Sequence, residues 1–187
     1  MARVIQEANY IRKRKKKYLI GSLISTGIMI FIFIIGIIIT KTRNNVFTVL
    51  AALLTLVVAQ YGVQIISIIK YKDGDSKVAK TLSELPNNYV VWNSALLGDN
   101  IGMTFLEHII ITDKEIVCIL DSMDKNYQAN VKSMERIAQN KGITQSIVFI
   151  QKGGKGFNEF LEKSQSHEIN DLKKQEEFIE LLKSASI

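Results

Sequence analysis

Residues 12–69 read RKRKKK YLIGSLISTGIMIFIFIIGIIIT KTRNN VFTVLAALLTLVVAQYGVQIISII, and this stretch decides the architecture of the chain. It contains two apolar runs, residues 18–40 and 46–69, and neither run carries a charged side chain. A helix needs about 20 apolar residues to cross a hydrocarbon core of about 30 Å, so each run is long enough. Because only five residues separate them, the runs are predicted to form an antiparallel transmembrane hairpin.

The distribution of Lys and Arg predicts the orientation of this hairpin. Seven of them precede the first run, whereas the loop between the runs contains Lys41 and Arg43. The positive-inside rule then predicts a multi-pass protein of the cell membrane with both termini in the cytoplasm. A cleaved signal peptide is the alternative, but the first run is longer than a typical signal core and no Ala-x-Ala pattern follows it.

Six consecutive cations stand directly before the first apolar run, and they are predicted to anchor the chain to anionic lipid headgroups at about 1 kcal/mol each. The net charge of +6 does not by itself indicate nucleic-acid binding, because residues 72–187 carry fourteen Lys and Arg against seventeen Asp and Glu. The bilayer is therefore the expected partner and nucleic acid is not, with a basic nucleic-acid arm as the alternative. The six cations are Arg12, Lys13, Arg14, Lys15, Lys16 and Lys17.

Polar side chains recur near the end of the second run. Gln60, Gln64 and Ser67 are four and three residues apart, so they share one face of a helix. Amide groups are costly to leave unbonded in lipid, and we expect these to bond within the hairpin first and to support self-association second. Snorkelling toward the interface and a substrate path are the alternatives. Small residues predicted to let the helices pack closely are Gly21, Gly27, Ala51, Thr55 and Ala59.

Residues 72–187 are predicted to form one small cytoplasmic α/β domain, with residues 1–17 as a separate basic cytoplasmic segment. A predicted helix ends before Pro86, and three runs rich in β-branched residues then indicate an antiparallel meander. A helix, a fourth strand and C-terminal helices complete the order. The expected helices are 76–85, 126–142, 157–163 and 169–183, and the expected strands are 89–97, 104–112, 115–120 and 143–150.

One stretch of this domain follows a known pattern. It reads Gly102-Met103-Thr104-Phe105-Leu106-Glu107-His108, and after a turn an apolar strand ends at Leu120-Asp121-Ser122. This stretch and the element order resemble the nuclease-related domain, whose pattern is Gly-x-Thr-Glu-hydrophobic-Asp-His followed by a strand ending in Glu-x-Lys. The resemblance implies a restriction-endonuclease-like fold with metal-binding and catalytic groups at these positions.

The chain departs from the pattern where that chemistry would occur. Phe105 replaces the first Glu, Glu107 replaces the Asp, and Leu120 and Ser122 replace the Glu and the Lys. Phosphodiester cleavage of this kind needs clustered carboxylates to hold a divalent cation, and usually a Lys. We therefore predict a catalytically degenerate nuclease-like domain without a metal or a cofactor.

The pairing register of the predicted β-hairpin, whose turn lies at residues 113–114, decides whether other side chains can rebuild the metal site. A simple turn there pairs Glu107 with Leu120 and points Asp121 to the opposite face, whereas a bulged turn would bring Glu107 opposite Asp121. His108 is expected to project away from Glu107, because neighbours in a strand alternate. The rebuilt site would comprise Glu107, Asp121 and either Lys125 or Lys152.

A glycine-rich loop, QKGGKGF, lies between the fourth predicted strand and a helix. Its residues Gly153, Gly154, Lys155 and Gly156 could contact a phosphate, although the spacing of a nucleotide-triphosphate loop is missing. A flexible connection is the alternative.

These features together predict a membrane-anchored interaction or scaffold protein, whose partner is another protein or a second copy of the chain. Two alternatives remain open. One is a membrane-tethered metal-dependent nuclease with a rebuilt site. The other is an accessory subunit of an envelope or transport complex that uses the hairpin itself for contact.

Overall fold

The computed structural model describes residues 1–121, 127–143, 146–164 and 171–186. These residues form two compact units. One is a helical hairpin that covers Ile11–Lys72, and the other is an α/β domain made of Met1–Tyr10 and Asp73–Ile187.

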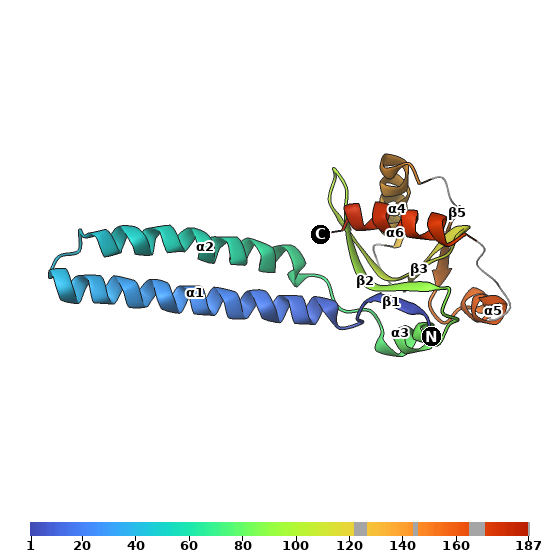
Figure 1. Ribbon diagram of the computed structural model, residues 1–187, viewed down its shortest axis with the longest axis horizontal. Helices are drawn as coiled ribbons and strands as arrows, with labels where there is room; N and C mark the ends of the chain where they lie inside the picture. Colours follow the sequence, from blue (N-terminus) through green and yellow to red (C-terminus); the bar gives the residue numbers. More distant parts are fainter. Residues whose placement is uncertain (122–126, 144–145, 165–170, 187) are drawn as a thin grey trace. The chain divides into compact units, whose positions relative to one another are not determined.

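The hairpin consists of α1 (Tyr10–Thr40) and α2 (Val46–Ile69), both long and apolar enough to cross a membrane. The two helices run side by side in opposite directions (Figure 1). Asn45 closes the turn, because its Oδ1 accepts from the backbone N–H of Thr48 at 2.9 Å and its Nδ2 donates to Thr40 Oγ1 at 2.8 Å. The basic residues 12–17 belong to the first turns of α1 and do not form a separate segment.

Two glycines let the helices approach each other closely. A Cβ atom on Gly36 would overlap the Phe47 Cβ, and one on Gly21 would lie 2.9 Å from the Tyr61 ring. Ala51 is buried as well. Nothing within 4 Å would meet a Cβ on Gly27, and Thr55 and Ala59 are exposed, so the predicted packing positions are only partly used between the two helices.

The α/β domain is built on a mixed five-stranded sheet in the order β1-β2-β3-β4-β5. Strands β2, β3 and β4 form the predicted antiparallel meander, and β5 lies parallel to β4. The strands are β1 (Arg3–Gln6), β2 (Val90–Gly98), β3 (Met103–Ile111), β4 (Glu115–Leu120) and β5 (Ser146–Gln151). The helices are α3 (Ser76–Ser83), α4 (Tyr127–Lys141), α5 (Lys155–Ser164) and α6 (Leu172–Ser184).

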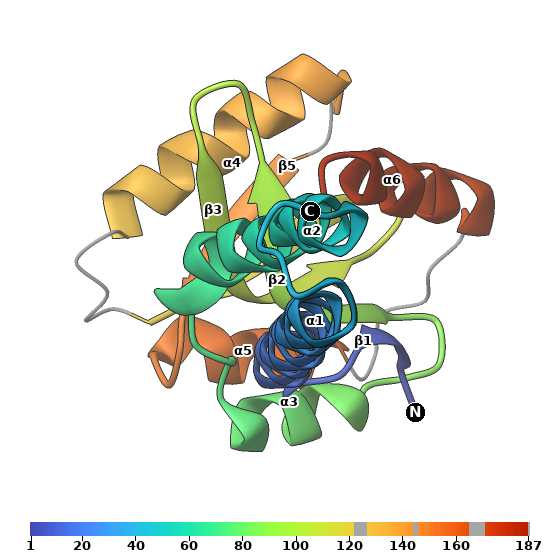
Figure 2. The same cartoon turned by 90° about the vertical axis from the view of Figure 1, so that its left-hand side faces the viewer.

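Helices cover both faces of this sheet, which gives three layers (Figures 1 and 2). On one face, Leu106 and Ile109 pack with Met134 of α4 and Phe178 of α6. The opposite face carries a second core, in which strand residues pack against α3 and α5. Fully burying an apolar side chain of this size stabilises a fold by about 1.5–3 kcal/mol, so the two cores hold the layers together.

Strand β1 was not predicted from the sequence. Arg3 and Val4 pair in parallel with Val90 and Val91 of β2, so the N-terminal residues belong to the α/β domain. This corrects the separate segment 1–17, because its first residues are part of the sheet and its last residues are part of α1. The hairpin is consequently an insertion between β1 and α3 of a single domain.

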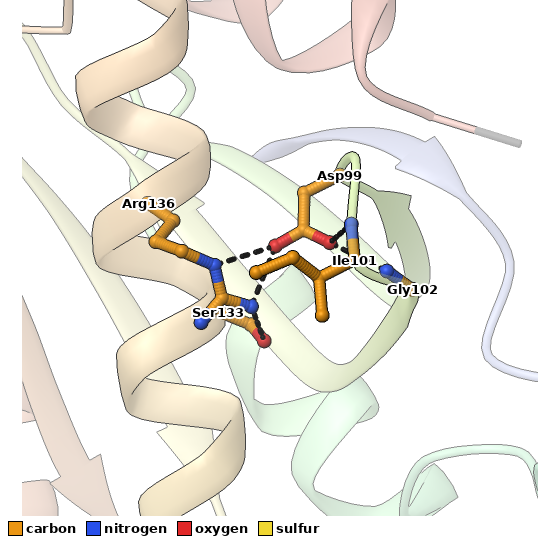
Figure 3. Close-up of polar contacts among 5 residues, drawn as sticks. All are labelled: Asp99, Ile101, Gly102, Ser133 and Arg136. Carbon is orange, nitrogen blue, oxygen red and sulfur yellow. Dashed lines mark hydrogen bonds and ion pairs between the residues drawn. The ribbon is translucent and has the colours of Figure 1, made fainter.

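The turn between β2 and β3 is fixed by one buried carboxylate (Figure 3). Asp99 Oδ2 accepts from Nε and Nη2 of Arg136 in α4 at 2.9 and 2.7 Å, and Oδ1 accepts from the backbone N–H groups of Ile101 and Gly102. The hydrogen bonds from Arg136 hold the pKa of Asp99 below its usual value. The side chain of Asp99 is only 3% exposed, so water has little access to the carboxylate of this ion pair.

Candidate functional site

Polar side chains enter the sheet where strand alternation breaks at Ser94, which has a φ of +52°. Trp92 and Ala95 are three residues apart, yet both belong to the core beneath α4 and α6. Leu106 and Ile109 on β3 are also three residues apart, and both belong to the same core. Since residues three apart in a regular strand face opposite sides, this arrangement leaves Glu107 and His108 together on the α3 and α5 side.

The buried hydroxyl of Ser94 joins the two chain segments that adjoin the hairpin. It donates to the backbone carbonyl of Ala8 at 2.9 Å and accepts from the backbone N–H of Gly74 at 3.0 Å. Gln6 supports this point, because its Nε2 donates to the Ser94 carbonyl and its Oε1 accepts from Trp92 Nε1. Both ends of the insertion are therefore held at one position in the domain.

His108 lies on β3, the strand that pairs with β2, and its side chain is fully buried and neutral. Asn93 Nδ2 donates to the Gln6 carbonyl, so Asn93 Oδ1 is the acceptor that faces His108 Nδ1 at 2.8 Å, and the imidazole proton lies on Nδ1. Burial lowers the pKa of His108 to about 4. The other nitrogen, Nε2, has no hydrogen-bond partner among the described residues, and Gly74 lies against the ring.

Three carboxylates gather around one ammonium group, and we call Asp75, Glu107, Asp121 and Lys152 the Lys152 cluster. Lys152 Nζ and Asp75 Oδ2 form an ion pair at 2.7 Å. This hydrogen bond lowers the pKa of Asp75 and raises the pKa of Lys152. Burial raises the pKa of Glu107, an effect that the charge of Lys152 offsets and the charge of Asp121 reinforces.

The structure brings together some of the residues of the rebuilt metal site, the alternative that the sequence left open. The ladder pairs His108 with Ile119, the register expected from a simple turn, and Asp121 directly follows β4. Glu107, Asp121 and Lys152 nevertheless interact electrostatically, whereas Lys125 lies outside the described residues. In the part of the chain that the structure describes, no three His, Cys, Asp or Glu side chains are placed to hold a metal ion.

Asp75 is the member of the cluster that sequence reasoning missed. Its Oδ1 accepts from the backbone N–H of Lys77 at 2.8 Å, so it is the N-cap of α3. An Asp directly before a helical pattern is a recognisable capping signal. The prediction that Glu107 and His108 face opposite sides was wrong, because the alternation on which it relied breaks at this point of the sheet.

The glycine-rich loop positions Lys152 at the end of β5. Gly153 adopts a φ of +69°, a conformation that favours glycine, and α5 begins at Lys155. The Gly154 carbonyl accepts from the backbone N–H of Phe157 at 3.1 Å. Gly156 and Lys155 are exposed, and their contact with a phosphate stays a prediction.

Two of the six basic residues, Arg14 and Lys15, have described partners within the hairpin unit, and Arg14 Nε donates to the Tyr18 hydroxyl at 3.0 Å. Lys15 Nζ donates to the backbone carbonyl of Ile69 at 2.8 Å and also to that of Tyr71. A cation at this position satisfies carbonyl groups at the C-terminal end of α2 and complements the helix dipole. The role of the basic residues at lipid headgroups stays a prediction.

The polar residues of α2 are not bonded across the hairpin. Ser67 Oγ donates to the Val63 carbonyl of its own helix at 2.8 Å. Gln60 is exposed and Gln64 is half-buried, and neither amide forms a hydrogen bond with any described residue. The expectation that this seam joins the two helices first is therefore not met.

Comparison of the sequence with protein-family models gave no match, and searches among curated proteins and solved structures gave none either.

Proposed function

We propose that this chain is a membrane-anchored interaction or scaffold protein whose cytoplasmic α/β domain has a catalytically degenerate, restriction-endonuclease-like fold. The order α3, β2, β3, β4, α4, β5 supports the nuclease-like element order. The positive-inside count supports the cytoplasmic side for both termini. The parallel pairing of β1 with β2 supports termini on one side, because residues before and after the hairpin share a sheet.

The observation that carries the proposal is the ion pair between Lys152 and Asp75. A nuclease of this kind uses its Lys and carboxylates on a metal-activated water. Here Asp75 directly follows Gly74, the residue bonded to Ser94, and it also caps α3. The ion pair between Lys152 and Asp75 therefore supports a structural role, in which it holds the segment that follows α2.

Cleavage of nucleic acid tests this proposal. The full chain in detergent is incubated with duplex and single-stranded DNA and RNA in the presence of Mg²⁺ or Mn²⁺, and no cleavage is expected. Cleavage that disappears in Glu107→Gln and persists in Glu159→Gln, a change on the exposed side of α5, would overturn it.

A positive test addresses the interaction role. The tagged chain, extracted from its own membrane in mild detergent, is expected to migrate with a second protein at a fixed ratio. Recovery of single copies of this chain, with neither another protein nor a second copy at a fixed ratio, would contradict the scaffold role. A reporter that is active only outside the cell, fused after Ile187, is expected to be inactive, and activity would overturn the cytoplasmic placement.

A membrane-tethered, metal-dependent nuclease is the second candidate, and the electrostatic interaction of Glu107 with Asp121 and Lys152 favours it. The described residues do not fit the metal that this reaction needs. Glu107 pairs in register toward Leu120, and its buried Oε2 has no hydrogen-bond partner among them. The cleavage experiment above separates the two candidates.

A further inference from the structure

The amide of Gln60 is an unbonded polar group on a surface that is otherwise apolar. Gln60 is exposed on α2, and Ala51, which is buried in the hairpin, lies nine residues earlier. Nine residues are about two and a half helical turns, so Gln60 projects from the side of α2 opposite Ala51. The partner of Gln60 therefore cannot be α1.

The depth of Gln60 makes an unbonded amide costly. It lies fourteen residues after Val46 and nine before Ile69, which corresponds to about 21 Å and about 14 Å along the helix. Those distances place it near the middle of a hydrocarbon core of about 30 Å, beyond the reach of headgroup water. Gln64 is only five residues from the end of α2, so it lies within reach of the interface.

The neighbours of Gln60 form a stripe with the spacing of a helix–helix seam. Positions separated alternately by three and four residues give a period of 3.5, the repeat of a left-handed helix pair. The apolar members of the stripe are each more than half exposed. The stripe consists of Val46, Val49, Leu53, Leu56, Gln60, Val63 and Ser67.

We propose that two copies of this chain associate in the membrane along this α2 stripe, with the two Gln60 amides hydrogen-bonded to each other. A primary amide both donates and accepts, so the same residue on a symmetry-related copy satisfies it. Copies with the same topology have parallel α2 helices, and an in-register pair places Gln60 opposite Gln60. Lipid tails offer neither donor nor acceptor, and one polar residue within an apolar seam fixes its register.

The association constant of the full chain in dimyristoylphosphatidylcholine vesicles tests the proposal, measured by energy transfer between labelled copies as lipid is added. Gln60→Leu is expected to weaken association about three- to thirtyfold. Gln60→Asn, which keeps the amide, is expected to lose less than Gln60→Leu. The control Gln64→Leu removes an amide that flanks the stripe only five residues before the end of α2, and it is expected to change the association constant less than twofold.

Cross-linking gives a second readout that does not depend on the amide. Cys118 is the only cysteine and is buried, so one introduced cysteine dominates oxidation. Val63→Cys is expected to form a covalent dimer, and Ile65→Cys, which is off the stripe, is not. A wild-type chain that stays single at every dilution, or a Gln60→Leu chain that associates as tightly as wild type, would overturn the proposal. Neither result would affect the cleavage test of the proposed function.

Discussion

The carboxylate of Asp99 depends on one cation, Arg136, for its charge balance. Arg136→Met would leave this buried group with its two backbone donors but without its counter-charge. We expect the free energy of unfolding of the α/β domain to fall by about 1.5–3 kcal/mol, the range for hydrogen bonds to charged groups. Fluorescence of Trp92, the only tryptophan, measures domain unfolding in the full chain. Lys132→Met, at an exposed position of the same helix, is the control and should change stability little.

His108 is expected to make the stability of the domain pH-dependent. Its pKa is about 4 in the folded chain and about 6.5 when unfolded, so between these values the unfolded chain binds more protons. Stability therefore falls as the pH drops from 6.5 toward 4, by up to about 1.4 kcal/mol for each pH unit from this group. Wild type and His108→Gln are compared by Trp92 fluorescence at pH 7 and pH 5. The variant should lose less stability, and equal losses would rule out a neutral buried His108.

The environment of His108 shows what residue-level patterns in the sequence can and cannot predict. The register that pairs Glu107 toward Leu120 follows from a simple turn, and the structure agrees with it. The break in alternation does not follow, because Ser94 adopts a positive φ that nothing in its residue type requires. That conformation depends on Ala8 and Gly74, which are far from Ser94 in the sequence.

The close approach of α1 and α2 is expected to depend on Gly36. In Gly36→Ala the new methyl group would overlap Phe47 Cβ, an atom fixed close to the backbone, so the helices must move apart. We expect a lower melting temperature of the hairpin in detergent, followed by circular dichroism. Gly27→Ala is the matched control, because its Cβ meets nothing within 4 Å. Equal melting temperatures for the two variants would show that the contact at Gly36 does not limit packing.

Elements with a strong local pattern were predictable, and those defined by distant partners were not. The apolar runs, the meander and α4 follow from periodicity and from turn residues, and the structure contains them near the expected bounds. Strand β1 has only four residues and no alternation of its own, so its pairing with β2 defines it as a strand. The Asp75–Lys152 ion pair could not be predicted from local pattern either, because most of the domain sequence separates the two residues.

For the whole molecule, the N-terminal residues are expected to be required by the domain. Residues 73–187 alone would expose the edge of β2 that β1 covers, and exposed edges favour aggregation. A chain in which a short Gly/Ser linker replaces residues 10–72 keeps β1, and it should be monomeric and soluble. Size-exclusion chromatography of the two variants checks this expectation. Equal behaviour would show that β1 is dispensable.

The Ser94 hydroxyl makes that replacement feasible. The Ala8 carbonyl and the Gly74 amide bond to the same oxygen, so they lie within two hydrogen-bond lengths of each other. A linker of a few residues therefore spans the gap without strain.

The position of β1 also constrains the order of events during translation. It leaves the ribosome before the hairpin, yet its partner strand is synthesised more than eighty residues later. Because sheet pairing must wait for β2, the proposed topology requires β1 to stay unpaired while the two helices partition into the bilayer. Under the proposed two-span topology, membrane insertion therefore precedes completion of the sheet, and a chain in which only one of the two helices inserts would leave β1 and β2 on opposite sides of the membrane, unable to pair.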